Sequence, residues 1–183
     1  MEFTLLGWPE DGPTLRLDHE QFSYAGKFVM SATGKAVVQN GESSAGSQYD
    51  DDIVAAVAFD ADRTDPGTLR CRYITVRRDR RGDGLGPRLL RFVADHARQR
   101  GYDRVSIAVN NPYAYEAAYR AGFTFTGDRT GLAELVCAFP PADDSAERYQ
   151  TGLDYYRKRE LTDAEEQFLA SRDAPPATVE SPA

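Results

Sequence analysis

A short apolar run followed by three closely spaced glycines is the feature that most constrains the fold of this chain. The run spans residues 73–76, and the glycines stand at 82, 84 and 86, directly before an amphipathic segment that begins at Pro87. This order is typical of a strand, a tight turn and a helix in an α/β domain. The first N–H groups of such a helix lack internal partners, and its dipole places partial positive charge there. The stretch therefore predicts an anion-binding turn.

The rest of the chain supplies regular segments on both sides of this turn. Alternation of apolar and polar residues predicts strands, and apolar residues three to four positions apart predict helices. Strands are expected at 2–8, 13–18, 35–39, 53–60, 69–77, 105–109, 123–128 and 132–139. Helices are expected at 18–32, from 87 to a stop at Gly101, and at 112–121. This order of elements predicts an α/β domain with a mixed sheet.

The domain organisation follows from a proline pair at 140–141, which marks the end of the regular domain, 1–139. Beyond it, three apolar residues at helical spacing and a capping box that begins at Thr162 predict a helical extension over 140–173. Residues 174–183 are rich in Pro, Ala and Ser, which predicts a disordered tail. The helices of the extension either dock on the domain or mediate association, with a partner or as a homodimer.

The charge and composition argue against several classes of partner. The net charge of −7 disfavours nucleic acid, because phosphate backbones are bound through basic surfaces. No apolar run approaches the roughly 18 residues of a membrane span. The acidic beginning Met1-Glu2-Phe3 is unlike a signal peptide, so a cytoplasmic protein is expected. Cys71 and Cys137 are too few for a disulfide framework and are expected as free thiols, and no metal site is predicted.

The basic residues are unevenly divided between lysine and arginine. Three lysines leave 19 arginines among the 22 basic residues, beside 18 aspartates. An acidic, lysine-poor surface is typical of proteins from halophilic sources. A GC-rich genome and an acidic surface that attracts cationic substrates are the two other interpretations.

Three phosphate-binding designs compete for the glycine turn. A Walker-type loop needs Gly-Lys-Ser/Thr, and neither of the two Gly-Lys pairs in this chain is followed by Ser or Thr. A dinucleotide fingerprint needs a third glycine at the position that Pro87 occupies. The third design is Arg-x-x-Gly-x-Gly at a strand-to-helix turn, formed here by Arg81, Gly84 and Gly86.

The residues around this third pattern resemble a motif of a known protein family. Residues 76–86, with two leucines after them, resemble the coenzyme A-binding motif of the GNAT superfamily of N-acetyltransferases. Four downstream residues stand at the spacing of that family's second signature: Asn111, Ala114, Gly122 and Phe123. The resemblance spans residues 35–139, and the element order matches. It implies a GNAT-like fold, with a mixed, mostly antiparallel sheet, a central splayed strand pair and here a C-terminal helical extension.

The resemblance also implies acetyl-coenzyme A as the cofactor. Backbone N–H groups of the glycine turn grip its pyrophosphate, and the open edge of the preceding strand pairs with its pantetheine arm and polarises the thioester carbonyl. Asn111 would hydrogen-bond the arm, unless it serves only as a helix cap before Pro112. Arg120 is interpreted as a surface arginine, with a contact to a phosphate as the alternative. The implied cofactor-binding residues are Ile74, Thr75, Val76, Arg81, Gly82, Asp83, Gly84, Leu85, Gly86 and Asn111.

Acetyl transfer to an amine needs a base for the amine, whose pKa in a free lysine is about 10.4, and an acid for the leaving thiolate. Many family members carry a tyrosine acid at the position of Ala118, so this chain departs from the pattern. Tyr115 and Tyr119 are the candidate catalytic residues, with ordinary packing as the alternative. For the base, Glu116 and Glu134 are the candidates, with structural or exposed roles as the alternative.

The expected function is therefore an N-acetyltransferase that acts on a small-molecule or peptide amine. Because the usual tyrosine is missing, the alternative is a coenzyme A-binding sensor or assembly module without efficient catalysis.

Overall fold

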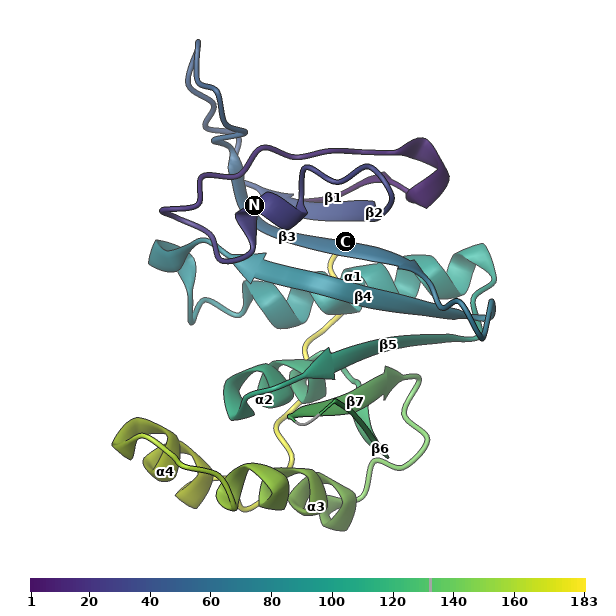
Figure 1. The fold of residues 1–183 in the computed structure, drawn as a ribbon, viewed down its shortest axis with the longest axis vertical. Coiled ribbons are helices and arrows are strands. Elements are labelled where there is room, and N and C mark those ends of the chain that lie inside the picture. The colour runs from purple at the N-terminus through teal and green to yellow at the C-terminus, as the bar shows by residue number, and fades with distance from the viewer. Residues whose placement is uncertain (132) are drawn as a thin grey trace.

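The computed structural model of the chain describes residues 1–131 and 133–183 and is built on a seven-stranded sheet (Figure 1). The strand order is β1-β2-β3-β4-β5-β7-β6. Every neighbouring pair is antiparallel except β4 and β5, so the predicted mixed, mostly antiparallel sheet is confirmed. The strands are β1 (Glu2–Gly7), β2 (Gly34–Gln39), β3 (Ile53–Ala61), β4 (Thr68–Val76), β5 (Arg104–Val109), β6 (Thr124–Thr130) and β7 (Glu134–Phe139). Position 132, where the last strand was expected to begin, lies outside the described residues.

The described residues form four α-helices beside the sheet: α1 (Leu85–Arg100), α2 (Pro112–Arg120), α3 (Ala146–Arg157) and α4 (Asp163–Ala170). Three short 3₁₀ turns are η1 (Pro9–Asp11), η2 (Ala25–Lys27) and η3 (Arg78–Arg80). Helix α1 links the parallel strands β4 and β5 and lies across one face of strands β1 to β5. It begins two residues earlier than predicted and ends at the expected Gly101, whose φ of 108° suits a helix stop. Among the described helices, even α1, with 16 residues, falls short of the length and apolarity that a bilayer crossing demands.

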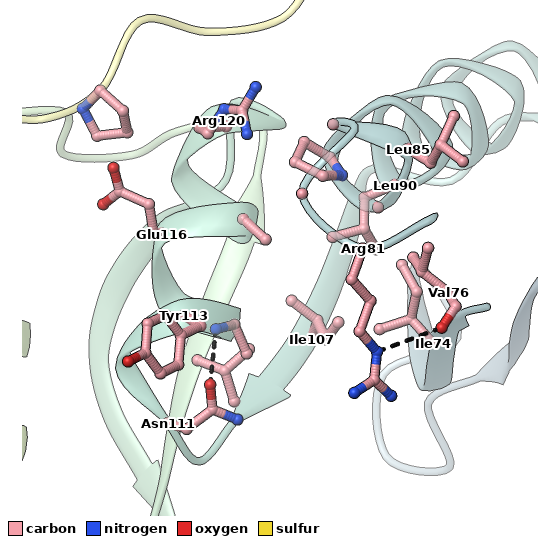
Figure 2. A pocket seen from close by; sticks show the side chains of 18 of the residues that line it. Ile74, Val76, Arg81, Leu85, Leu90, Ile107, Asn111, Tyr113, Glu116 and Arg120 are labelled. Carbon is pink, nitrogen blue, oxygen red and sulfur yellow. Dashed lines mark hydrogen bonds between the residues drawn. The ribbon is translucent and has the colours of Figure 1, made fainter. Parts of the chain in front are cut away.

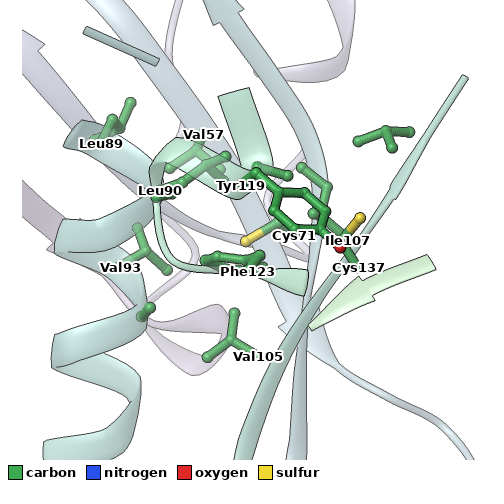
Figure 3. Packing of buried hydrophobic residues seen from close by; sticks show 14 of the residues in the cluster. Val57, Cys71, Leu89, Leu90, Val93, Val105, Ile107, Tyr119, Phe123 and Cys137 are labelled. Carbon is green, nitrogen blue, oxygen red and sulfur yellow. The ribbon is translucent and has the colours of Figure 1, made fainter. Parts of the chain in front are cut away.

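The main core lies between the sheet and α1 (Figure 3). Leu89, Leu90 and Val93 form the apolar face of α1, as the sequence spacing predicts, and are buried. Both cysteines are buried and free in this core. Burial raises the pKa of the Cys71 thiol to about 12 and also raises that of Cys137, so both stay protonated near neutral pH.

The opposite face of the sheet is covered by an irregular segment, residues 13–33, where two predictions are wrong. The expected strand at 13–18 is not a strand, and the expected helix at 18–32 is reduced to η2. Tyr24 has a left-handed φ of 60°, which no α-helix tolerates. Five apolar side chains of the segment nevertheless pack on the sheet as a second core: Leu15, Leu17, Phe22, Ala25 and Phe28. Packing of these side chains on the sheet, and not their helical spacing, therefore determines the conformation of the segment.

A single buried lysine holds this segment in place. The Lys35 side chain on β2 is fully buried, and its ammonium donates to the backbone carbonyls of Pro13, Met30 and Thr33 at 2.6, 2.6 and 3.1 Å. A fourth bond goes to the Thr33 hydroxyl. Burial lowers the pKa of this ammonium. The lysine therefore joins both ends of the irregular segment to the sheet.

The C-terminal extension docks on the domain. Tyr149, Leu153 and Tyr156 of α3 are buried in the main core, and the Tyr156 hydroxyl donates to the carbonyl of Val109 at the end of β5. A Cβ at Gly152 would overlap the Tyr115 hydroxyl, so α3 approaches α2 as closely as a glycine allows. The docking interpretation of these apolar residues is thus confirmed.

Residues 174–183 contain no helix or strand, and their disorder stays a prediction. The structure gives them a defined path, from α4 past α2 to α1 (yellow in Figure 1). The Val179 N–H donates to the Arg120 carbonyl at 2.7 Å, and the Ser181 hydroxyl bonds to Asp95.

Replacing Lys35 by methionine should lower the free energy of unfolding by about 2–4 kcal/mol, because three buried carbonyls lose their charged donor. Denaturant titration measures the change. Lys158→Met, at an exposed lysine, is the control and should change stability little. A loss below about 1 kcal/mol for Lys35→Met would show that the segment does not depend on this contact.

Candidate functional site

The central strands β4 and β5 pair for only part of their length. Their parallel ladder runs from Thr68 and Arg104 to Cys71 and Ile107, where it stops. Beyond that point β4 continues to Val76 without a partner from β5. The other edge of β4 stays paired with β3 as far as Val76. The two strands therefore splay apart and leave one edge of β4 open, as predicted.

The direction of the open amides follows from the antiparallel ladder between β3 and β4. The Arg77 N–H donates to the Val54 carbonyl, so by alternation Thr75 exchanges its bonds with Ala56. Ile74 and Val76 then direct their N–H and C=O groups to the opposite edge, into the splay. The Val76 carbonyl accepts a long bond of 3.4 Å from Arg81. The N–H groups of Ile74 and Val76 are thus directed at a ligand that enters between the strands.

The glycine turn leaves the start of α1 without a cap. Gly84 is the N-cap residue, with φ of 76°, and no side chain caps this helix. The first helical bond runs from Arg88 to the Gly84 carbonyl, so the N–H groups of Gly84, Leu85 and Gly86 lack helical partners. Asn111, Ser145 and Thr162 cap α2, α3 and α4 through their side chains. An uncapped start is therefore peculiar to α1 among the α-helices of the described chain, and it favours an anion.

Two arginines lie at this turn with different orientations (Figure 2). Nη2 of Arg120, on the last turn of α2, is 3.4 Å from the position that a Cβ on Gly84 would take. In the described part of the chain no carboxylate pairs with Arg120. Arg81 instead turns away and donates to Val76 and to the Ser23 hydroxyl, the latter at 3.0 Å. Arg120, interpreted from the sequence as a surface residue, is the better placed of the two for a phosphate.

A cleft of about 1620 Å³ joins the glycine turn to the splayed strands. Its walls contain Ile74, Thr75 and Val76 of β4, most of the turn and the first residues of α2, including Asn111. The Asn111 side chain accepts a hydrogen bond from the Ala114 N–H at 2.8 Å, so it caps α2, as one of its two predicted roles requires. The same side chain also faces the cleft (Figure 2). Of the predicted cofactor residues, the structure brings all but Asp83 to this cleft. Asp83 forms an ion pair with Arg80 at 2.8 Å.

The irregular segment supplies the wall on the other face of the sheet. Ser23 and Tyr24 line the cleft next to Arg72 and Tyr73 of β4. Tyr24 is 56% exposed, and its ring lies 5.8 Å from that of Tyr73. Its left-handed backbone is strained for a tyrosine, and such strain is often found at functional sites. No sequence pattern pointed to Tyr24, because the helix expected at 18–32 contains this residue.

The two predicted catalytic tyrosines lie outside the cleft. The Tyr115 hydroxyl donates to the Tyr149 carbonyl at 3.0 Å, and the Tyr119 hydroxyl accepts the Phe125 N–H at 3.1 Å. Both side chains are buried, and burial raises the pKa of both hydroxyls. A protonated hydroxyl can act as an acid, but these two point into the core beside α3. Their catalytic role stays a prediction, and the geometry gives it no support.

Helix α2 presents different residues to the core and to the cleft. Tyr115, Ala118 and Tyr119 face the core, whereas Tyr113, Glu116 and Arg120 line the cleft. Glu116 accepts the Tyr149 hydroxyl at 2.7 Å and pairs with Arg172 at 3.3 Å. These contacts hold Glu116 against the C-terminal extension, so they favour a structural role for Glu116 over its predicted role as the base. Glu134, the other candidate, is exposed at the edge of the cleft.

Comparison with known protein families gives one match. A family model described as "Acetyltransferase (GNAT) family" matches residues 8–123, which is more than half of the chain. This span includes the glycine turn, the splayed strands and α2, and it ends before β6, β7 and the C-terminal extension. A search of curated proteins finds no match.

Many solved structures resemble this fold. Nourseothricin acetyltransferase is 24% identical, with a TM-score of 0.46, over 58% of this chain and 64% of its own. The alignment therefore covers less than two thirds of that protein. A Bacillus subtilis acetyltransferase solved in complex with CoA is 14% identical, with a TM-score of 0.46, over 58% of this chain and 75% of its own. A protein from Desulfovibrio desulfuricans, described as a GNAT-family acetyltransferase, aligns over 75% of this chain and 97% of its own, at 17% identity and a TM-score of 0.51.

Proposed function

The chain belongs to the GNAT family of acetyltransferases, and on that premise we propose that it transfers an acetyl group from acetyl-coenzyme A to an amine. The observation that carries the proposal is the uncapped start of α1 beside Arg120, which has no ion-pair partner among the described residues. These groups lie at one end of a cleft whose other end is an open strand edge.

Each part of the cleft fits a different part of coenzyme A. The N–H groups of Gly84, Leu85 and Gly86, together with Arg120, suit the phosphates, because backbone donors at a helix start and a guanidinium both favour anions. The open amides of Ile74 and Val76 suit the amide groups of the pantetheine arm, which can pair with them as an added strand would. The cofactor supplies the acetyl group as a thioester.

The chain's own residues supply orientation and electrostatic stabilisation. The Ile74 N–H is the proposed donor to the oxygen that gains negative charge when the amine attacks. Asn111 retains an amide N–H for the arm while its oxygen caps α2. The acceptor amine is proposed to enter past Tyr24 and Tyr73, on the face of the sheet opposite α1. Whether the acceptor is a small molecule or a peptide is proposed to depend on this wall.

The leaving thiolate requires a proton, and a tyrosine hydroxyl in the cleft is the proposed donor. Tyr73 and Tyr113 line the cleft, at its β4 and α2 walls, and are the proposed sources. Glu134 is the proposed base, because it is an exposed carboxylate at the cleft edge. The proposed acids differ from the sequence-based assignment to Tyr115 and Tyr119, whereas Glu134 is one of the two bases suggested by the sequence.

The buried hydroxyls of Tyr115 and Tyr119 and the alanine at 118 favour a second candidate function, a module that binds coenzyme A without efficient transfer. A panel of amines incubated with acetyl-coenzyme A separates the two, with released thiol as the readout. Thiol release that depends on the amine supports the transferase. Tight binding without release for every amine supports the binding module, and no binding contradicts both.

Gly84→Val should weaken acetyl-coenzyme A binding by about 100-fold, because it disturbs the turn that supplies charge-assisted hydrogen bonds worth about 1.5–3 kcal/mol each. Gly84 has a φ of 76°, and its new side chain would crowd Arg120. Gly41→Val is the matched control, since Gly41 has a φ of 78° in open space outside the cleft. Calorimetric titration of both variants measures the affinity. Equal affinities for the two variants would contradict the phosphate site.

Tyr115→Phe should lower stability by about 1 kcal/mol, through the lost bond to the Tyr149 carbonyl. It should leave kcat within about twofold, whereas Tyr113→Phe, which removes a hydroxyl from the cleft, should lower kcat by about tenfold or more. Steady-state kinetics with an acceptor from the panel measures both. A large loss of kcat for a folded Tyr115→Phe protein would instead favour the sequence-based assignment.

A further inference from the structure

We propose that the C-terminal segment 173–179 forms the wall of the cleft that holds the nucleotide end of coenzyme A. This inference rests on the proposed function and assigns a binding role to a part of the chain beyond the residues that the family model matches.

The segment lies at the phosphate end of the cleft. The Val179 N–H donates to the carbonyl of Arg120, the residue whose guanidinium lies beside Gly84. Figure 2 shows the tail, in pale yellow, crossing the end of the cleft where Arg120 lies, away from Asn111. Six residues of the segment line the cleft: Asp173, Ala174, Pro176, Ala177, Thr178 and Val179. A cofactor whose phosphates reach Gly84 would therefore have its nucleotide next to this segment.

The segment bounds the cleft and does not fill it. The cavity of about 1620 Å³ remains beside it. No described acidic group pairs with Arg120, so the segment leaves this guanidinium available to a phosphate. Its residues from 174 to 179 carry no charge and offer proline, alanine and valine surfaces with backbone polar groups. That chemistry suits the flat, partly apolar face of a purine and its ribose, while the phosphates remain with Arg120 and the turn.

The start of the segment is fixed by contacts between α4 and α2. The Arg172 guanidinium lies 4.1 Å from the ring centroid of Phe168 and pairs with Glu116. The Phe168 ring in turn lies 4.7 Å from that of Tyr113. The Arg172 carbonyl accepts a bond from Gln150 of α3 at 2.8 Å. The wall is therefore held at Arg172 and again at Val179, and the residues between these points span the nucleotide end.

The test compares two ligands on two proteins, the full chain and a chain that ends at Asp173. Acetyl-coenzyme A contains the nucleotide, and S-acetyl-4′-phosphopantetheine lacks it but keeps a phosphate for the glycine turn and Arg120. The truncation should weaken the binding of acetyl-coenzyme A by about tenfold or more, equivalent to about 1.4 kcal/mol, and leave the binding of S-acetyl-4′-phosphopantetheine unchanged. Calorimetric titration gives the affinities, and circular dichroism with thermal melting checks the fold.

A second pair of variants in the full chain isolates the contact at Val179. Val179→Pro removes the N–H that bonds to Arg120, whereas Val179→Ala keeps it. Only the proline variant should reproduce the loss of affinity for acetyl-coenzyme A. This pair of variants tests the proposal even if the truncated chain fails to fold.

Three results would overturn the proposal: an unchanged affinity for acetyl-coenzyme A after truncation, a tighter one, or an equal loss for both ligands. The tighter affinity would show that the segment blocks the cofactor, and the equal loss would show a purely structural role. If the full chain binds neither ligand, the proposed function fails along with this inference. Binding by the full chain without an effect of truncation overturns the inference alone.

Discussion

The separation of β4 from β5 is the constraint on which the rest of this structure depends. Pairing stops at Cys71 and Ile107, where β4 also carries an irregularity opposite Ala58 and Phe59 of β3. An extra residue in one strand increases its bend and twist, which helps to direct β4 away from its parallel neighbour. The open amides of Ile74 and Val76 would be costly if they were buried without partners. A cleft that a polar ligand can enter is the arrangement that removes this cost.

The sequence was most informative where local rules decide the structure. The three glycines, the apolar stripe of α1 and the stop at Gly101 depend only on backbone freedom and helical periodicity, and they appear as predicted. The open strand edge came from the family resemblance, because splaying is a relation between two strands and leaves no mark on either one alone. Asn111 shows both of its predicted aspects, a helix cap that also lines the cleft.

The errors lie where long-range contacts override local pattern. Residues 18–32 have helical spacing, but Lys35 draws the backbone carbonyls at both ends of the segment to one point, and Tyr24 adopts a left-handed conformation. A similar limit applies to the tyrosines of α2. Spacing of about 100° per residue shows which residues share a face of a helix, but not which face meets the cleft. That choice depends on α3, whose Gly152 and Tyr149 draw Tyr115 into the core.

The two halves of the cleft are built in different ways, and this difference bears on specificity. The half proposed for the cofactor is made largely of backbone groups, from β4 and the start of α1. The half proposed for the acceptor is made of side chains on the irregular segment, where Ser23 bonds to Arg81 and Tyr24 lies on Tyr73. Under the proposed function, a change in the segment between 13 and 33 would alter the choice of acceptor while the proposed cofactor site keeps its backbone geometry, in line with the general rule that one fold serves many functions through changes at its site.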